Sequence, residues 1–256
     1  MNAFEKHGVY HLSPSRINKW IEQPALCLLE IAGIKDQAGP SAWRGTATDK
    51  AVTKASQEPL LDLDSIKAYA HEVFDGELLL AEKPNEKSVE KERGNLDAYV
   101  ESGVNWIQTI EPVKSAQGKV VVELDDVPVP VHGYYDLLTE NSVRDMKTGL
   151  TTPKELKAKH GRQMAIYVKA TQREAWIDFI SKKGVTSFKV DNIPFWERNF
   201  IVAAQSLERT LAMSDDIFEC CQQVFPDLDG MYGWMWSDKQ RRAAIDIWNL
   251  EGLTNV

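Results

Sequence analysis

The stretch GYYDLLTENSVRDMKTG, residues 133–149, predicts a β-hairpin. Aromatic, aliphatic and β-branched residues on both sides of TENS favour strands, and the polar residues TENS favour a turn. With TENS as the turn, Leu138 pairs with Val143 and Leu137 lies opposite Arg144 in an antiparallel register. A bulged residue would shift that register by one, so the register is part of the prediction.

The same register places Asp136 opposite Asp145. Opposed side chains of an antiparallel pair point to one side, with Cβ atoms about 5 Å apart, and like charges there are destabilising. Lys147 points to the same side because side chains alternate along a strand. A hard divalent cation would relieve the repulsion, and Lys147 would then be placed to position or deprotonate a water. The alternative is a solvated hairpin face with a surface ion pair between Asp145 and Lys147.

Strand-forming runs on both sides extend the hairpin into a sheet. A three-stranded antiparallel meander is predicted over residues 119–124, 127–138 and 143–148. Two further strands, joined by the turn KKG, are predicted over residues 174–181 and 187–193. These five strands form the predicted central sheet.

A helix is predicted between the third and fourth strands, over residues 151–170. Thr152 and Glu155 have the spacing of a capping box, and Pro153 stands at the first helical position. Downstream, the pattern predicts a long helix over residues 194–225 and a short helix near the end of the chain.

Helical periodicity dominates the residues before the sheet. Pro24 splits the first helical run into two short helices. Further helices are predicted to start near Gly45 and to cover residues 62–80 and 95–110, with a loop over 35–45 and an exposed charged connection over 83–94. The fold class is therefore α/β: a central mixed β-sheet with an antiparallel meander, flanked by helices, with an N-terminal helical part.

The bulk composition limits the classes of function. The 256 residues fit a single domain, with a mainly helical part over 1–115, a sheet and helix over 116–195 and C-terminal helices over 196–256. A net charge of −8 argues against coating nucleic acid by charge alone. No signal-peptide or membrane-spanning pattern is present in the sequence, so a soluble, cytoplasmic location is expected.

Positive charge gathers beside the hairpin. Residues 144–173 contain eight lysines and arginines but only two acids, in a chain that is acidic as a whole. Phosphate contact requires such a local excess of cations. The alternative is a solvated helix face, which accounts for Lys154 and Lys157 but less well for the contrast with the rest of the chain.

The hairpin motifs resemble the PD-(D/E)XK nuclease superfamily in its RecB-like exonuclease branch. Residues 133–136 carry the first acid, and residues 145–149 carry the Asp-x-Lys motif. The resemblance implies that Asp136 and Asp145 hold Mg²⁺ or Mn²⁺, that the backbone carbonyl of Met146 is a further ligand, and that Lys147 assists the attacking water.

Two helical motifs extend the resemblance. Gln163 and Tyr167 match the Gln-x-x-x-Tyr motif of the branch and lie on one helix face, although a core-facing pair is the alternative. Asp49 stands where the Gly-x-x-x-His motif has its metal-binding histidine; it is either a replacement ligand or an exposed helical acid. The residues expected to contact nucleic acid are Arg44, His160, Arg162 and Tyr167.

The cysteines depart from the iron–sulfur members of the branch. Only Cys27, Cys220 and Cys221 are present, the last two adjacent, whereas a standard cluster needs four thiolates. No iron–sulfur cluster is therefore expected. Three cysteines, two of them neighbours, also do not form a disulfide framework.

The resemblance implies a metal-dependent DNA nuclease, expected to be a stand-alone exonuclease from a viral or recombination system. Its expected partners are a DNA substrate and a single-strand-binding or recombination protein. The alternative is a catalytically degenerate nuclease fold that binds nucleic acid or a protein partner, favoured by the missing histidine and the acidic charge. A third candidate is a carboxylate–metal hydrolase of small phosphoesters.

Overall fold

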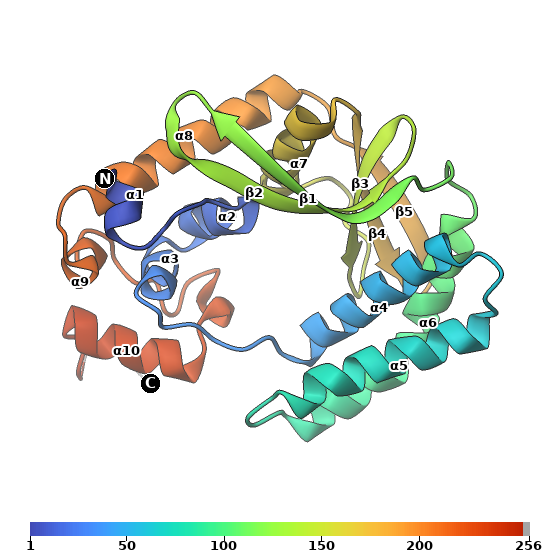
Figure 1. Cartoon of the computed structure of the whole chain (residues 1–256). Helices are drawn as coiled ribbons and strands as arrows, with labels where there is room; N and C mark the ends of the chain where they lie inside the picture. The colour runs from blue at the N-terminus through green and yellow to red at the C-terminus, as the bar shows by residue number, and fades with distance from the viewer. Residues whose placement is uncertain (253–256) are drawn as a thin grey trace. The chain divides into compact units, whose positions relative to one another are not determined.

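The computed structural model describes residues 1–252, and its elements are labelled as in Figure 1. The chain divides into two compact units, which are described separately. The first unit comprises Met1–Asp36, Val121–Gly133 and the residues from Pro194 onward; the second comprises Gln37–Val120 and Tyr134–Ile193. The single domain expected from the sequence, with its three parts, stays a prediction.

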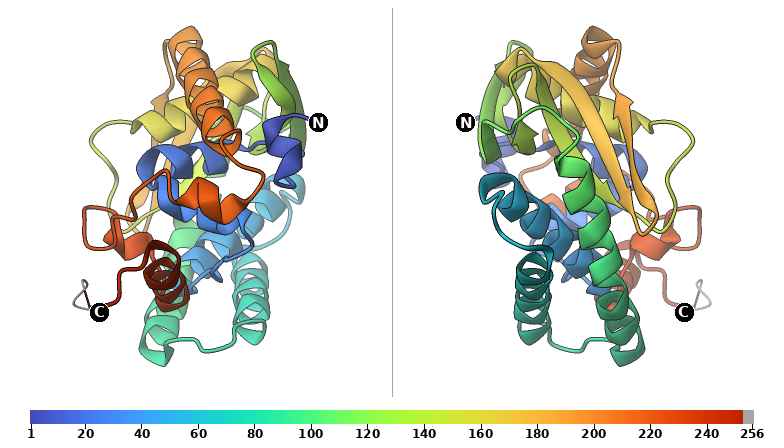
Figure 2. Two further views of the ribbon diagram at one scale, coloured as in Figure 1. Left: turned by 90° about the vertical axis from the view of Figure 1, so that its left-hand side faces the viewer. Right: turned by 90° about the vertical axis from the view of Figure 1, so that its right-hand side faces the viewer.

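Three long helices form the helical part of the second unit: α4 (Pro40–Gln57), α5 (Leu63–Leu79) and α6 (Glu86–Ile107). Helices α5 and α6 run side by side (Figure 2). Their apolar faces bury a common core whose members are Trp43, Ala47, Ala51, Ala55, Ile66, Ala70, Phe74, Leu96, Val100 and Val104. Burial of these faces stabilises the three helices more than their intrinsic propensity does.

Two of these helices start earlier than the sequence pattern predicts. Helix α4 begins at Pro40, not near Gly45, because proline suits the first helical turn, where its missing N–H has no intrahelical partner. Helix α6 begins at Glu86, within the segment expected to be a charged connection. The Asn85 side chain accepts a hydrogen bond from the Ser88 N–H at 2.9 Å and caps this helix.

The five strands form one sheet in the order β1-β2-β3-β4-β5. The strands are β1 (Ser115–Leu124), β2 (Val127–Leu138), β3 (Ser142–Thr148), β4 (Glu174–Ser181) and β5 (Gly184–Lys189), and β1 and β2 run through both units. Strand β3 pairs antiparallel with β2 and parallel with β4, and β4 pairs antiparallel with β5. The predicted α/β class, with a mixed sheet flanked by helices, is confirmed.

The β2–β3 hairpin has the predicted register over its two paired positions, which do not include Asp136 and Asp145. Leu137 pairs with Arg144, and Leu138 pairs with Val143. In β3, Met146 packs with residues of α4 and α6, whereas the neighbouring Asp145 binds Gln163 of α7 (Ala158–Thr171). Alternation along β3 therefore directs Met146 to the α4 and α6 side of the sheet and Asp145 to the α7 side.

Helix α7 connects the parallel strands β3 and β4, but it starts later than predicted. The capping box at Thr152 and Glu155 does not form, and the helix begins at Ala158. The Gly149 N–H still bonds the Ile180 carbonyl at 3.1 Å, and the Gly149 carbonyl accepts the Tyr99 hydroxyl at 3.0 Å. The chain after β3 is thus held at the end of the sheet. Residues 150–157 then carry the chain to the face of the sheet that α7 covers, so the helix begins only at Ala158.

The first unit contains the helices α1 (Ala3–Lys6), α2 (Pro14–Glu22), α3 (Pro24–Ile31), α8 (Ile193–Leu211), α9 (Ile217–Cys221) and α10 (Asp238–Trp248). The predicted split at Pro24 is confirmed. The single long helix predicted over 194–225 is wrong, because α8 ends at Leu211 and Asp216 caps α9 by accepting from the Phe218 N–H. Within residues 1–252, no helix has the length and apolar character needed to cross a membrane.

Candidate active site

Strands β2 and β3 separate just beyond the pair Leu137↔Arg144, and two side chains supply hydrogen bonds there. The Asp136 carboxylate accepts the Met146 N–H at 2.5 Å. The Tyr134 carbonyl accepts the Tyr167 hydroxyl at 2.6 Å. These side chains thus allow the strands to part while those two backbone groups keep hydrogen-bond partners.

Asp145 lies at the bottom of this opening. It is 2% exposed, and its Oδ2 forms an ion pair with Lys147 Nζ at 2.5 Å. Its Oδ1 accepts a hydrogen bond from Gln163 Nε2 at 2.8 Å. The Lys147 side chain keeps 35% of its surface exposed, although its ammonium group is paired with the buried carboxylate. The ion pair places both side chains on one side of β3, as the alternation predicts.

Gln163 and Tyr167 of α7 connect the acid to the neighbouring strand. Gln163 Nε2 also donates to the Tyr167 hydroxyl oxygen at 2.9 Å, and that hydroxyl donates to the Tyr134 carbonyl. The two residues, one turn apart on the helix, thus form a hydrogen-bonded chain from Asp145 to β2. Both side chains thus make polar contacts with the candidate site.

Asp49 reaches the same region from α4. A Cβ at Gly45 would lie 3.1 Å from Thr148 Oγ1, so glycine permits a close approach of α4 to the end of β3. Asp49 lies one helical turn further on the same face. Both of its carboxylate oxygens accept from Gln117 Nε2 at 3.0 Å, and the same nitrogen lies 3.4 Å from Asp136 Oδ1.

Burial and mutual repulsion set the charge state of the three acids. Burial, with the nearby Asp145 charge, raises the pKa of Asp49 to about 6. Burial and the Asp145 and Asp49 charges raise the pKa of Asp136 well above its ordinary value. Burial also raises the pKa of Asp145, against the opposing effect of Lys147. Burial alone would lower the pKa of Lys147, but the surrounding carboxylates outweigh it and raise this pKa.

The donor set matches a hard divalent cation in its chemistry. Asp49, Asp136 and Asp145 supply carboxylate oxygens, the ligands that Mg²⁺ and Mn²⁺ prefer. The buried Asp145 Oδ2 has no hydrogen-bond partner besides its ion pair. In the described part of the chain, however, no three histidine, cysteine, aspartate or glutamate side chains are gathered closely enough to hold a metal. The acids fit the ion chemically, but they must draw closer together to enclose it.

The four side chains expected to contact nucleic acid are all buried: Arg44, His160, Arg162 and Tyr167. Arg44 forms an ion pair with Glu92, also buried, and lies over the Tyr99 ring. His160 Nδ1 accepts the Lys157 N–H, and its ring packs edge-on against Phe179. Side chains enclosed in this way leave little surface for a phosphate, and their contact with nucleic acid stays a prediction.

Gln117 is the site residue that the sequence pattern does not identify. It lies on β1 with φ +52, in the left-handed region. The available signal is the next residue, because a glycine within a strand pattern marks a bulge or a close approach. A Cβ at Gly118 would lie 2.1 Å from the Tyr135 ring, which confirms the close approach.

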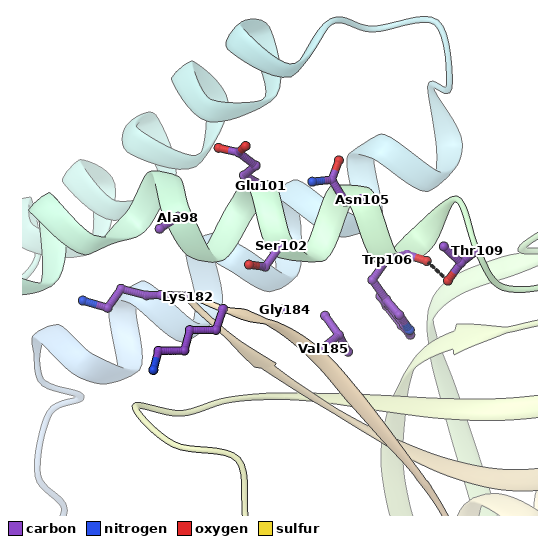
Figure 3. Close-up of a pocket in the computed structure, with 10 residues that line it drawn as sticks. Ala98, Glu101, Ser102, Asn105, Trp106, Thr109, Lys182, Gly184 and Val185 are labelled. Atoms are coloured by element: carbon purple, nitrogen blue, oxygen red, sulfur yellow. Dashed lines mark hydrogen bonds between the residues drawn. The ribbon is translucent and has the colours of Figure 1, made fainter.

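A separate pocket lies between α6 and the β4–β5 turn (Figure 3). Its lining includes Glu101, Ser102, Lys182 and Lys183. None of the candidate site residues lines it.

Comparison of the sequence with known protein families identifies the family of this chain. The family model described as the PD-(D/E)XK nuclease superfamily matches residues 11–235. The chain belongs to this superfamily. A nuclease-type function and use of a divalent metal are therefore general properties of its relatives. No curated protein matches the sequence.

One solved structure that resembles this superfamily member is described as "Crystal structure of SSO0001". The identity is 12% and the TM-score is 0.33, over 49% of this chain and 60% of that chain. This chain thus spans less than two thirds of the matched protein's length, and so distant a likeness indicates no function.

Proposed function

We propose that the chain is a divalent-metal-dependent nuclease of the RecB-like branch that hydrolyses phosphodiester bonds of DNA as an exonuclease. The observation that carries the proposal is the gathering of Asp136, Asp145 and Lys147 on one side of the sheet, where β2 and β3 separate. Membership of a nuclease superfamily supports a phosphodiester substrate.

The acids would hold the metal. Asp49, Asp136, Asp145 and the backbone carbonyl of Met146 are the proposed ligands of Mg²⁺ or Mn²⁺. When bound, such an ion polarises a phosphoryl oxygen and lowers the pKa of a bound water. We also propose that no iron–sulfur cluster is present, since only three cysteines are available.

Lys147 would act as a cation beside Asp145. The carboxylates raise its pKa, so the amine stays protonated at neutral pH. An ammonium group next to Asp145 can donate hydrogen bonds to the attacking water or to a phosphate oxygen, where negative charge increases in the transition state. Gln163 and Tyr167 would orient Asp145 through their hydrogen-bonded chain.

The segment between β3 and α7 is a further proposed DNA contact. Lys154 and Lys157 are exposed there, a few residues beyond Lys147. Exposed lysines on a connection beside the reacting groups can contact backbone phosphates without reading bases. Binding should therefore weaken steeply with salt.

A time course on end-labelled single- and double-stranded oligonucleotides tests the proposal. Cleavage from the ends should require Mg²⁺ or Mn²⁺ and stop with chelator. Asp145→Asn and Lys147→Met should each lower the rate by about 100-fold or more. Asp97→Asn, which removes a carboxylate from the exposed side of α6, is the matched control and should keep the parent rate. Variants at Asp145 and Lys147 that cleave as fast as the parent would refute the assignment.

A second candidate is a degenerate nuclease fold that binds nucleic acid or a protein partner without cleaving DNA. The observation that favours it is the separation of the three acids, together with aspartate at the position of the family histidine. Calorimetric titration with Mn²⁺ discriminates the two. Binding that is lost in Asp136→Asn supports the nuclease, whereas no binding to the parent protein supports the degenerate fold.

A further inference from the structure

Gln117 has an unusual backbone for its place in the fold. Four described residues other than glycine have positive φ: Gln117, Gln172, Asn192 and Asn249. Gln172 and Asn249 cap helix ends, where the left-handed conformation is common. Gln117 alone of the four lies within a strand. Because a Cβ disfavours this conformation, an outlier held inside a strand points to a role for its side chain.

The side chain of Gln117 lies between two of the acids. Its Nε2 is 3.0 Å from both oxygens of Asp49 and 3.4 Å from Asp136 Oδ1. The amide orientation follows from the partners, since Oε1 would face acceptors only. The amide hydrogens thus bring positive partial charge directly between these two carboxylates.

We propose that Gln117 has two roles at the metal site. Without a cation, its amide nitrogen lies between the carboxylates of Asp49 and Asp136, and when a cation binds, its amide oxygen becomes a ligand. This inference rests on the proposed function. A cation bound to both Asp49 and Asp136 must lie close to the position of Nε2. The NH₂ group of the amide therefore has to move away from this position. A half-turn of the amide group, with the side chain drawn back from the acids, would direct Oε1 at the cation, and an amide oxygen is a ligand that hard cations accept.

The same exchange accounts for the separation of the acids. An amide held by hydrogen bonds of about 3 Å keeps two carboxylates further apart than metal–oxygen distances of about 2.1 Å would. Replacement of the amide by an ion would therefore draw Asp49 and Asp136 together. The ligand set would then contain an oxygen from β1 in addition to those from α4, β2 and β3.

Three variants test this role by metal affinity and by thermal unfolding. Gln117→Met keeps the length of the side chain but removes both the donor and the oxygen. Gln117→Glu keeps an oxygen ligand but removes the donor. Gln172→Met makes the same change at another left-handed glutamine, away from the acids, and is the matched control.

With Mn²⁺ in a calorimeter, Gln117→Met should bind about 10-fold more weakly than the parent protein, and Gln117→Glu should bind at least as tightly. In chelator at pH 7.5, Gln117→Glu should melt below both the parent and Gln117→Met, because a further carboxylate then faces two others. Mn²⁺ should restore its melting temperature. Gln172→Met should keep the parent affinity.

Three results would each overturn the inference. Mn²⁺ affinity in Gln117→Met equal to that of the parent, with binding lost in Asp136→Asn, refutes the role of Gln117 and leaves the proposed nuclease intact. A parent protein that binds no Mn²⁺ refutes the proposed function and the inference together. An unchanged melting temperature of Gln117→Glu in chelator contradicts the bridging role independently of metal binding.

Discussion

Lowering the pH from 7.5 to 5 should remove the contribution to stability that depends on a neutral His160, the buried histidine of α7. The ring is 5% exposed, lies 5.3 Å from the Phe179 ring and accepts the Lys157 N–H through Nδ1 at 3.3 Å. Burial, followed by the charges of Lys147, Lys159 and Lys157, lowers the pKa of His160 to about 4. Protonation would add a charge among cations and remove the acceptor for the Lys157 N–H.

The direction and size follow from linkage. The pKa of His160 is lower in the folded chain than the ordinary value of 6.5, so the unfolded chain binds the proton first as pH falls. The contribution of His160 to stability is therefore lost as pH falls below 6.5, and the loss continues until pH reaches about 4. At pH 5 the unfolded imidazole is almost fully protonated and the native one is not, which costs about 2 kcal/mol at about 1.4 kcal/mol per pH unit.

Urea unfolding of the parent and of His160→Gln at both pH values measures this effect. Glutamine at this third helical position can still accept the Lys157 N–H but does not titrate. At pH 7.5 the variant should be less stable by about 1 kcal/mol, because it loses the ring contact with Phe179. At pH 5 the order should reverse, since only the parent has lost the stability that depends on a neutral imidazole. A stability difference between the two proteins that does not change with pH would refute the reasoning.

Three further predictions concern the scaffold of the site. Glu92→Gln should lower the unfolding free energy by about 3–5 kcal/mol in urea unfolding, because Arg44 stays buried without its counter-charge. The double variant Arg44→Met with Glu92→Met should recover most of the lost unfolding free energy. Equal losses in the single and the double variant would contradict this reasoning. Tyr167→Phe should cost about 1–3 kcal/mol in the same assay, because the Tyr134 carbonyl loses its donor, and a neutral effect would mean that another donor replaces it. Gly45→Leu should weaken Mn²⁺ binding in calorimetry more than Gly45→Ala does, because a larger side chain pushes α4 away from β3; equal affinities would show that this approach is not needed.

Local geometry explains which parts of the site were predictable. The hairpin register follows from a short turn and from alternation within 17 residues, so Leu137↔Arg144 and the shared side of Asp145 and Lys147 could be predicted. The shared face of Gln163 and Tyr167 follows from helical spacing alone. The start of α7 could not be predicted, because the chain must first pass from the end of β3 to the opposite face of the sheet, and this path outweighed the local capping signal of Thr152.

The strand pattern, the α/β class and the order of the acidic, lysine and glutamine motifs each depend on residues a few positions apart, so the amino-acid sequence alone predicts them. The meeting of Gln117 with Asp49, 68 residues away, and the pairing of Arg44 with Glu92 in the core are properties of the folded chain. Both depend on how closely α4 packs against its neighbours, which glycine contacts and burial decide in three dimensions. A side chain's spacing in the chain sets the face on which it lies, but the packing of distant elements decides what that face meets.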